Sequence, residues 1–198
     1  MPRLFTALEI PREAALSLSL LRGGLPGARW IDVENYHMTL RFMGDVECHV
    51  ADEIVEALDR VHRSPFQITL SGVGAFGGKK PHAVWAGVTP SASLNALQAE
   101  IDRICQRIGL SPDQRKFTPH VTLARLRNAS PIDVAHYLSA RGNFAALPFK
   151  VGRFVLMSSR DSVGGGPYIV EEAWPLAAEM RGAPSLSASF SDASRIMR

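Results

Sequence analysis

The stretch NYHMTLRFMG, residues 35–44, contains the pattern H-x-T-L, and the same pattern returns in FTPHVTLARL, residues 117–126. The chain has only six histidines, and His37 and His120 each open one copy. Two copies would arise by chance in about one of several thousand shuffled sequences, so the pattern indicates an internal repeat. The two segments therefore predict equivalent strands in two related halves of the molecule.

Strand geometry decides which side chains of each copy lie together. On a strand, residues two apart share a face at about 6.6–7 Å. His37 and Thr39 therefore point the same way, as do His120 and Thr122, while the intervening residue and the leucine point into the core. If the two strands lie side by side under a pseudo-twofold axis, two imidazoles and two hydroxyls converge in one cleft. Arg41 continues the face of His37 and Thr39.

The flanking segments mix the strand and helix periods, which indicates an α+β chain. We expect strands at residues 3–10, 36–44, 66–76, 82–88, 117–126, 148–159 and 167–176, and helices at 11–24, 49–64, 91–109 and 130–142. From each H-x-T-L strand the order runs strand, helix, strand, strand, which predicts a duplicated α+β unit. Residues 1–180 are expected to form one domain. Residues 181–198 are small, polar and aperiodic, which predicts a disordered tail.

The composition is typical of a soluble globular protein: 198 residues, 46% hydrophobic and 21% charged. No apolar run approaches the roughly 18 residues that cross a bilayer, so no membrane partner is expected. The opening MPRLFTALEIP lacks the features of a secretory signal, and Cys48 and Cys105 have no metal-like spacing, so a cytoplasmic protein with reduced thiols is expected. A net charge of +3 favours an anionic partner such as RNA without requiring one.

Two imidazoles and two hydroxyls in one cleft suit hydrolysis of a phosphodiester by in-line displacement. One imidazole removes a proton from water and the other protonates the departing sugar oxygen, which the ordinary histidine pKa of about 6.5 permits. The hydroxyls of Thr39 and Thr122 can donate hydrogen bonds to the non-bridging oxygens. Proton transfer is handled at both ends, so we expect neither a metal nor another cofactor.

With these two motifs the chain resembles the 2H phosphoesterase superfamily, and more closely its RNA 2′,3′-cyclic phosphodiesterase family, also called 2′-5′ RNA ligase. The resemblance extends over most of residues 2–176 and includes RLFTALEIP, RWIDVENYHMTLRFMGDV, FTPHVTLARL and LMSSRDSVGGGPYIVEEAWPL. The second motif also keeps the arginine that follows it, Arg125, which in relatives looks like a contact to the substrate phosphate.

The resemblance implies a bilobal α+β fold, with two antiparallel sheets lining a central cleft and helices packed outside. It implies opening of an RNA 2′,3′-cyclic phosphate to a 2′-phosphate, together with reversible 2′-5′ RNA ligation. We expect the enzyme to be a monomer. By the same analogy His37 is the acid and His120 the base, although the pseudo-symmetry leaves the sequence nearly silent on these roles. Arg41, Phe42 and Tyr168 are candidate further substrate contacts.

Other readings of single residues are less consistent with the sequence. Zinc bound by the two histidines would need a third protein ligand, and neither motif carries one at ligand spacing. Lys79 and Lys80 follow two glycines but do not fit a phosphate-binding loop, because no Ser or Thr follows Lys79. Phe42, Phe76 and Trp30 are candidates for base stacking or for ordinary packing.

Two further functions stay open at this point. The same chemistry could act on a cyclic phosphate of a small nucleotide, since the loops that would select the substrate are the least readable part of the chain. The cleft could also belong to a nucleotide- or RNA-binding module without catalysis. Intact histidines in both copies argue against that module, because permanently charged arginines bind phosphate better.

Overall fold

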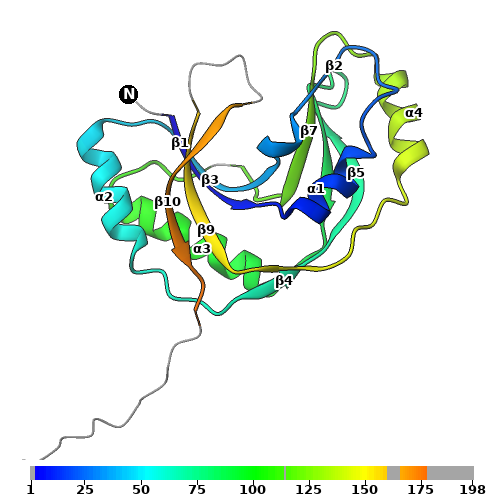
Figure 1. The fold of residues 1–198 in the computed structure, drawn as a ribbon. Helices are drawn as coiled ribbons and strands as arrows, with labels where there is room; N and C mark the ends of the chain where they lie inside the picture. Colours follow the sequence, from blue (N-terminus) through cyan, green and yellow to red (C-terminus); the bar gives the residue numbers. More distant parts are fainter. Residues whose placement is uncertain (1–2, 114, 160–165, 178–198) are drawn as a thin grey trace, which may run out of the picture.

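The computed structural model describes residues 3–113, 115–159 and 166–177 (Figure 1). Its strands are β1 (Arg3–Glu9), β2 (Ala28–Trp30), β3 (His37–Asp45), β4 (Phe66–Ile68), β5 (Leu70–Phe76), β6 (Ala83–Val88), β7 (His120–Leu126), β8 (Phe149–Val151), β9 (Arg153–Ser159) and β10 (Tyr168–Pro175). Its α-helices are α1 (Arg12–Ser19), α2 (Cys48–Leu58), α3 (Ala92–Arg107) and α4 (Pro131–Arg141), and a 3-10 turn covers Val33–Asn35.

The strands form two four-stranded antiparallel sheets and one two-stranded sheet. The first sheet has the order β10-β9-β1-β3, the second has the order β2-β7-β6-β5, and β4 pairs with β8. Figure 1 shows α2 and α3 beside the first sheet and α4 beside the second. The predicted α+β fold with two antiparallel sheets and outer helices is thereby confirmed.

The two H-x-T-L motifs lie on neighbouring strands of different sheets. His37 and His120 are the first residues of β3 and β7, and these two strands are in contact. One continuous core of buried apolar residues runs beneath both sheets and includes Leu40 from β3 and Leu123 from β7. The motif leucines therefore point into the core, as the sequence predicts.

The 83-residue spacing of the two histidines holds well beyond the motifs. The bounds of α2, 48–58, shifted by 83, are those of α4, 131–141. The same shift takes β4 (66–68) onto β8 (149–151) and β5 (70–76) onto β9 (153–159). The chain therefore contains two equivalent units, β1-α1-β3-α2-β4-β5 and β6-α3-β7-α4-β8-β9.

The two four-stranded sheets nevertheless do not correspond to the two successive halves of the chain. β5 follows β3 in sequence but belongs to the sheet of β7, and β9 follows β7 but belongs to the sheet of β3. Each unit thus gives its last strand to the other sheet. The β4–β8 pair, in which Phe66 lies opposite Val151, joins the two crossing segments.

Helix ends follow local sequence chemistry. The Ser91 hydroxyl accepts a hydrogen bond from the Leu94 amide at the start of α3, and Ser130 does the same for Ile132 at the start of α4. α1 ends at Ser19, earlier than the predicted residue 24. The predicted tail, 181–198, lies outside the described residues. Within the part of the chain that is described, no helix is long and apolar enough to span a membrane.

Candidate active site

A bulge interrupts the alternation of β3 directly after its motif. Against β1, Ala7 lies opposite Thr39 and Thr6 lies opposite Arg41, so Leu40 has no partner in the register. An extra residue moves every later side chain to the other face. Phe42 therefore shares a face with His37 and Thr39, whereas Arg41 turns to the opposite one.

The second motif strand carries the same bulge at the equivalent position. Trp85 lies opposite Thr122 and Val84 opposite Ala124, so Leu123 is skipped. The face of β7 that carries His120 and Thr122 continues with Arg125, which is exposed. Arg125 and Phe42 are thus equivalent positions of the two repeats, 83 residues apart.

The expectation that Arg41 shares the face of His37 is wrong, and the bulge is the physical reason. The Arg41 side chain is only 4% exposed, and its Nε lies 3.0 Å from Oδ1 of Asp102 on α3. A second carboxylate, Asp113, lies 3.7 Å from Nη1, and Nη2 donates a hydrogen bond to the Ser111 carbonyl. Arg41 therefore joins β3 to α3 and to the segment that leads to β7.

The two histidine rings are held in the same way. His37 Nδ1 lies 2.8 Å from the Asn35 carbonyl oxygen, and His120 Nδ1 lies 2.6 Å from that of Thr118. A carbonyl oxygen can only accept, so Nδ1 carries the hydrogen in each ring. Nε2 is left with the lone pair in the neutral ring, so each histidine presents its basic nitrogen on the side away from its own backbone.

Aromatic rings pack around both histidines. The Tyr168 ring meets His37 edge-on at 4.7 Å and Phe5 lies 5.0 Å from it. On the other side of the site, the Phe76 ring meets His120 edge-on at 4.8 Å, and Trp85 lies 5.9 Å from the same ring. These contacts limit the rotation of each imidazole and remove part of its water.

The environment lowers the pKa of both histidines. For His37, burial is the largest cause, and the charges of His120 and Arg125 lower the pKa further against the opposing bond to the Asn35 carbonyl. For His120, burial is again the largest cause, with Arg125 adding to it against the bond to the Thr118 carbonyl. His120 and Arg125 come from the second sheet and act on a histidine of the first, so the three groups share one electrostatic site.

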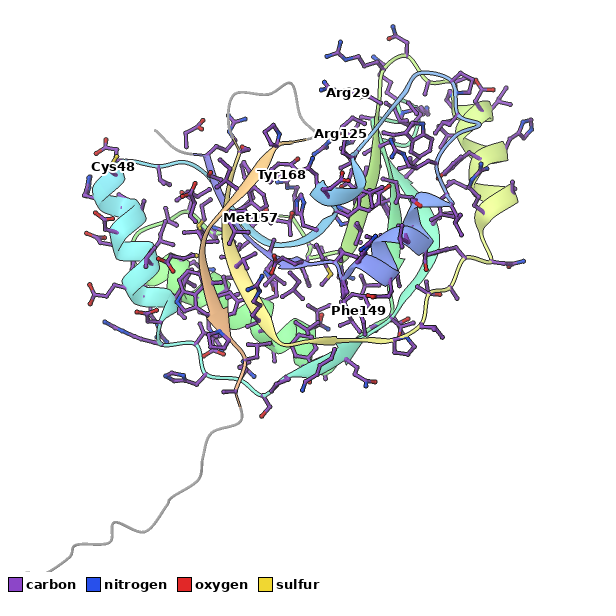
Figure 2. All side chains as sticks on the ribbon, in the orientation of Figure 1. Arg29, Cys48, Arg125, Phe149, Met157 and Tyr168 are labelled. Atoms are coloured by element: carbon purple, nitrogen blue, oxygen red, sulfur yellow. The ribbon has the colours of Figure 1, made fainter. Side chains whose placement is uncertain are left out.

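The other predicted site residues fall around this pair. Thr39 and Thr122 are half-buried on the histidine faces, and Phe42 is 42% exposed. In Figure 2 the labelled Arg125, from β7, and Tyr168, from β10, lie at the upper ends of the two sheets. An open pocket of about 370 Å³ is lined by Phe42 together with Arg41, Met43, residues 109–113 and Arg115. Trp30, a candidate for stacking, instead packs on Tyr137 of α4.

Sequence reasoning missed Phe5 and Trp85, which flank the two histidines. Both residues are ordinary strand formers, and only the pairing of β1 with β3 and of β6 with β7 brings them to the site. One signal was present: Gly74 lies inside a strand, where glycine often marks a close approach. A Cβ at Gly74 would lie 2.3 Å from the Trp85 ring, so the glycine is what lets that ring lie across β5.

Among the described residues, no group of three or more His, Cys, Asp or Glu side chains could hold a metal ion. The site as seen in those residues therefore consists of two imidazoles, two hydroxyls, one guanidinium group and the aromatic rings around them. Such a set can transfer protons and stabilise negative charge, which are the operations that phosphodiester cleavage requires.

Comparison with known proteins shows that the chain is similar to phosphodiesterases. Residues 22–162 match the model of the 2′-5′ RNA ligase superfamily. The chain is 41% identical over 122 residues to a protein of Aeropyrum pernix named RNA 2′,3′-cyclic phosphodiesterase, an alignment that covers 61% of this chain and 69% of that protein. A protein of Thermotoga maritima with the same name is 32% identical over 176 residues, with 85% and 92% covered.

Among solved structures, the chain resembles Escherichia coli LigT complexed with 3′-AMP. The TM-score is 0.74 at 26% sequence identity, and the superposition covers 90% of this chain and all of that one. The similarity therefore includes both sheets and is not confined to the two motifs.

Proposed function

This chain belongs to the 2′-5′ RNA ligase superfamily, and on that basis we propose that it hydrolyses the 2′,3′-cyclic phosphate at an RNA 3′ end to a 2′-phosphate. The relatives named RNA 2′,3′-cyclic phosphodiesterase support the reaction and its substrate class. The observation that carries the proposal for this chain is the pair of equivalently held histidines on two strands in contact.

In the proposed mechanism, water attacks the phosphorus atom as the bond to the 3′ oxygen breaks. Nε2 of His120 takes the proton from water, and Nε2 of His37 delivers a proton to the departing 3′ oxygen. The hydroxyls of Thr39 and Thr122 and the guanidinium group of Arg125 stabilise the charge on the non-bridging oxygens. The histidine roles rest on the resemblance. The same pair would serve 2′-5′ ligation, in which an RNA 5′ hydroxyl attacks the cyclic phosphate in place of water.

The lowered pKa values fit this mechanism once the substrate charge is included. Without substrate, both rings favour the neutral form, which suits the base. A bound phosphodiester brings a negative charge, which favours the protonated form of a nearby imidazole and so charges the acid. The substrate itself therefore completes the required pair of one neutral and one protonated histidine.

The proposal is tested with an RNA oligonucleotide that ends in a 2′,3′-cyclic phosphate, incubated with the pure protein in EDTA. We expect ring opening to the 2′-phosphate, and a loss of at least about a hundredfold in His37→Gln and in His120→Gln, the size of a general acid–base contribution. His62→Gln is the matched control, because His62 is exposed on the loop after α2. Ring opening that survives in either motif variant would refute the paired mechanism.

A cytoplasmic location, a monomeric state and the domain limits 1–180 and 181–198 stay predictions from the sequence. The monomer is tested by light scattering of the purified chain, in which a mass near the 21.6 kDa of one chain is expected.

A further inference from the structure

A second arginine lies beside Arg125 on the same face of the second sheet. β2 is a three-residue edge strand next to β7, and its central residue, Arg29, lies directly opposite Arg125 in the antiparallel register. Directly opposed residues of such a pair have Cβ atoms about 4.5–5.5 Å apart and project from the same face. Figure 2 labels both arginines at the upper end of the second sheet.

Packing of the neighbouring residue confirms the direction of Arg29. Trp30 lies 5.9 Å from the Tyr137 ring of α4, so it faces the outer, helix-covered side of the sheet. Successive residues of a strand point to opposite faces. Arg29 therefore faces the inner side, which is the side of His120 and Arg125, and both arginines are exposed there.

Positive charge gathers further at this end of the sheet. Ala83 of β6 lies opposite Arg125 on one side and opposite Phe76 on the other, so the β5–β6 connection with Lys79 and Lys80 lies at the same end of the sheet as the two arginines. Both lysines are exposed. A phosphate placed between the two arginines would be attracted by both guanidinium groups, which makes this end of the sheet suited to a phosphate backbone.

We propose that Arg29 binds the phosphate immediately upstream of the reacting cyclic phosphate, so that it selects polymeric RNA over a cyclic mononucleotide. The inference rests on the proposed function, in which Arg125 contacts the reacting phosphate. The adjacent Arg29, on the edge strand beside Arg125, then meets the next phosphate along the RNA strand. A nucleoside 2′,3′-cyclic phosphate has no upstream phosphate and gains nothing from Arg29, whereas an oligonucleotide does.

The test compares two substrates: adenosine 2′,3′-cyclic phosphate and a short oligoadenylate with the same 3′ end. For Arg29→Gln we expect kcat/KM to fall about tenfold on the oligonucleotide, the size of one charge-assisted hydrogen bond, and to stay unchanged on the mononucleotide. The salt dependence of log KM for the oligonucleotide should become shallower by about 0.7, the contribution of one neutralised phosphate in a single strand. Arg29→Lys should keep the salt slope and recover part of the loss.

Arg107→Gln is the matched control, because it removes one positive charge from the exposed end of α3, a helix that packs on the other side of the first sheet's motif strand. An equal loss on both substrates, or no loss on either, would overturn the assignment. Binding measured by fluorescence anisotropy in a His120→Gln background decides the role of Arg29 without turnover. If the wild type opens neither substrate, the proposed function fails, while the binding comparison still supports or refutes the phosphate contact.

Discussion

Replacement of the buried Arg41 by methionine should destabilise the protein without weakening its binding of a cyclic phosphate. Methionine keeps the apolar stem of the side chain and removes the charge. Removing one partner of a buried ion pair costs about 3–5 kcal/mol, because the other charge is left unpaired. Here the carboxylates of Asp102 and Asp113 are 23% and 31% exposed, so water can partly replace the lost guanidinium group.

The geometry of the main contact also lowers the expected cost. Nε of Arg41 and Oδ1 of Asp102 lie 3.0 Å apart, but without the alignment of a hydrogen bond. We therefore expect a loss of about 2 kcal/mol in the free energy of unfolding. For a chain of this size, that corresponds to roughly 4–8 °C in the thermal midpoint. Because Asp102 shares the interaction, Arg41→Met combined with Asp102→Asn should cost less than the sum of the two single changes.

The assay is thermal denaturation followed by circular dichroism, with kcat and KM measured well below the midpoint. Arg60→Met is the control, since Arg60 pairs with Glu56 on the surface with both side chains more than three-quarters exposed, and such pairs contribute little. A variant of Arg41 with an unchanged midpoint and a raised KM would refute the structural role. That result would instead support the prediction from the sequence, in which Arg41 lies on the face of His37 and contacts the substrate.

Three further predictions concern the surroundings of the two histidines. Arg125→Gln should raise the pKa of both motif histidines, because its positive charge lowers both, and the titration of the imidazole Cε1 protons by NMR measures this; an unchanged pKa in either ring would show that Arg125 does not face it. Because the folded state lowers the pKa of both rings, it binds fewer protons than the unfolded chain just below pH 6.5. The wild type should therefore lose stability as the pH falls through that range, and the Arg125→Gln variant should lose less. Gly74→Ala would place a Cβ 2.3 Å from the Trp85 ring, so we expect the free energy of unfolding to fall by about 1–3 kcal/mol and kcat to decrease. Gly152→Ala is the control, because Gly152 is exposed and a Cβ there meets no atom within 4 Å. An unchanged kcat together with an unchanged Trp85 fluorescence spectrum would contradict this prediction.

The sequence predicted the parts of the fold that depend on local pattern. The repeated H-x-T-L strands, the apolar stripe of α3 and the capped start of α4 all follow from residues close together in the chain. The exchange of β5 and β9 between the sheets could not be predicted, because strands of either unit carry the same alternating pattern. The pairing of β2 with β7, which fixes the position of Arg29, could not be predicted either, because a strand of three residues has too short a pattern.

The site shows the same division between local and non-local information. His37 and Thr39 share a face because they are two residues apart, and so do His120 and Thr122. The bulge at the residue after each threonine comes from the register with a neighbouring strand, and no residue within the motif predicts it. Arg41 was therefore assigned to the wrong face, because the prediction counted two residues per step through the bulge.

The repeat explains why the two histidines alone do not show which of them is the acid and which is the base. Each is held by the carbonyl two residues before it and flanked by two aromatic rings, so the two halves of the site are nearly interchangeable. The symmetry breaks at the next position of each strand, where one repeat has Phe42 and the other has Arg125. At this position of the two motif strands, both within the described residues, β7 carries a positive charge and β3 does not, and Arg29 extends that charge away from the histidines. The orientation of the substrate, and hence which imidazole meets the departing oxygen, must follow from this asymmetric rim.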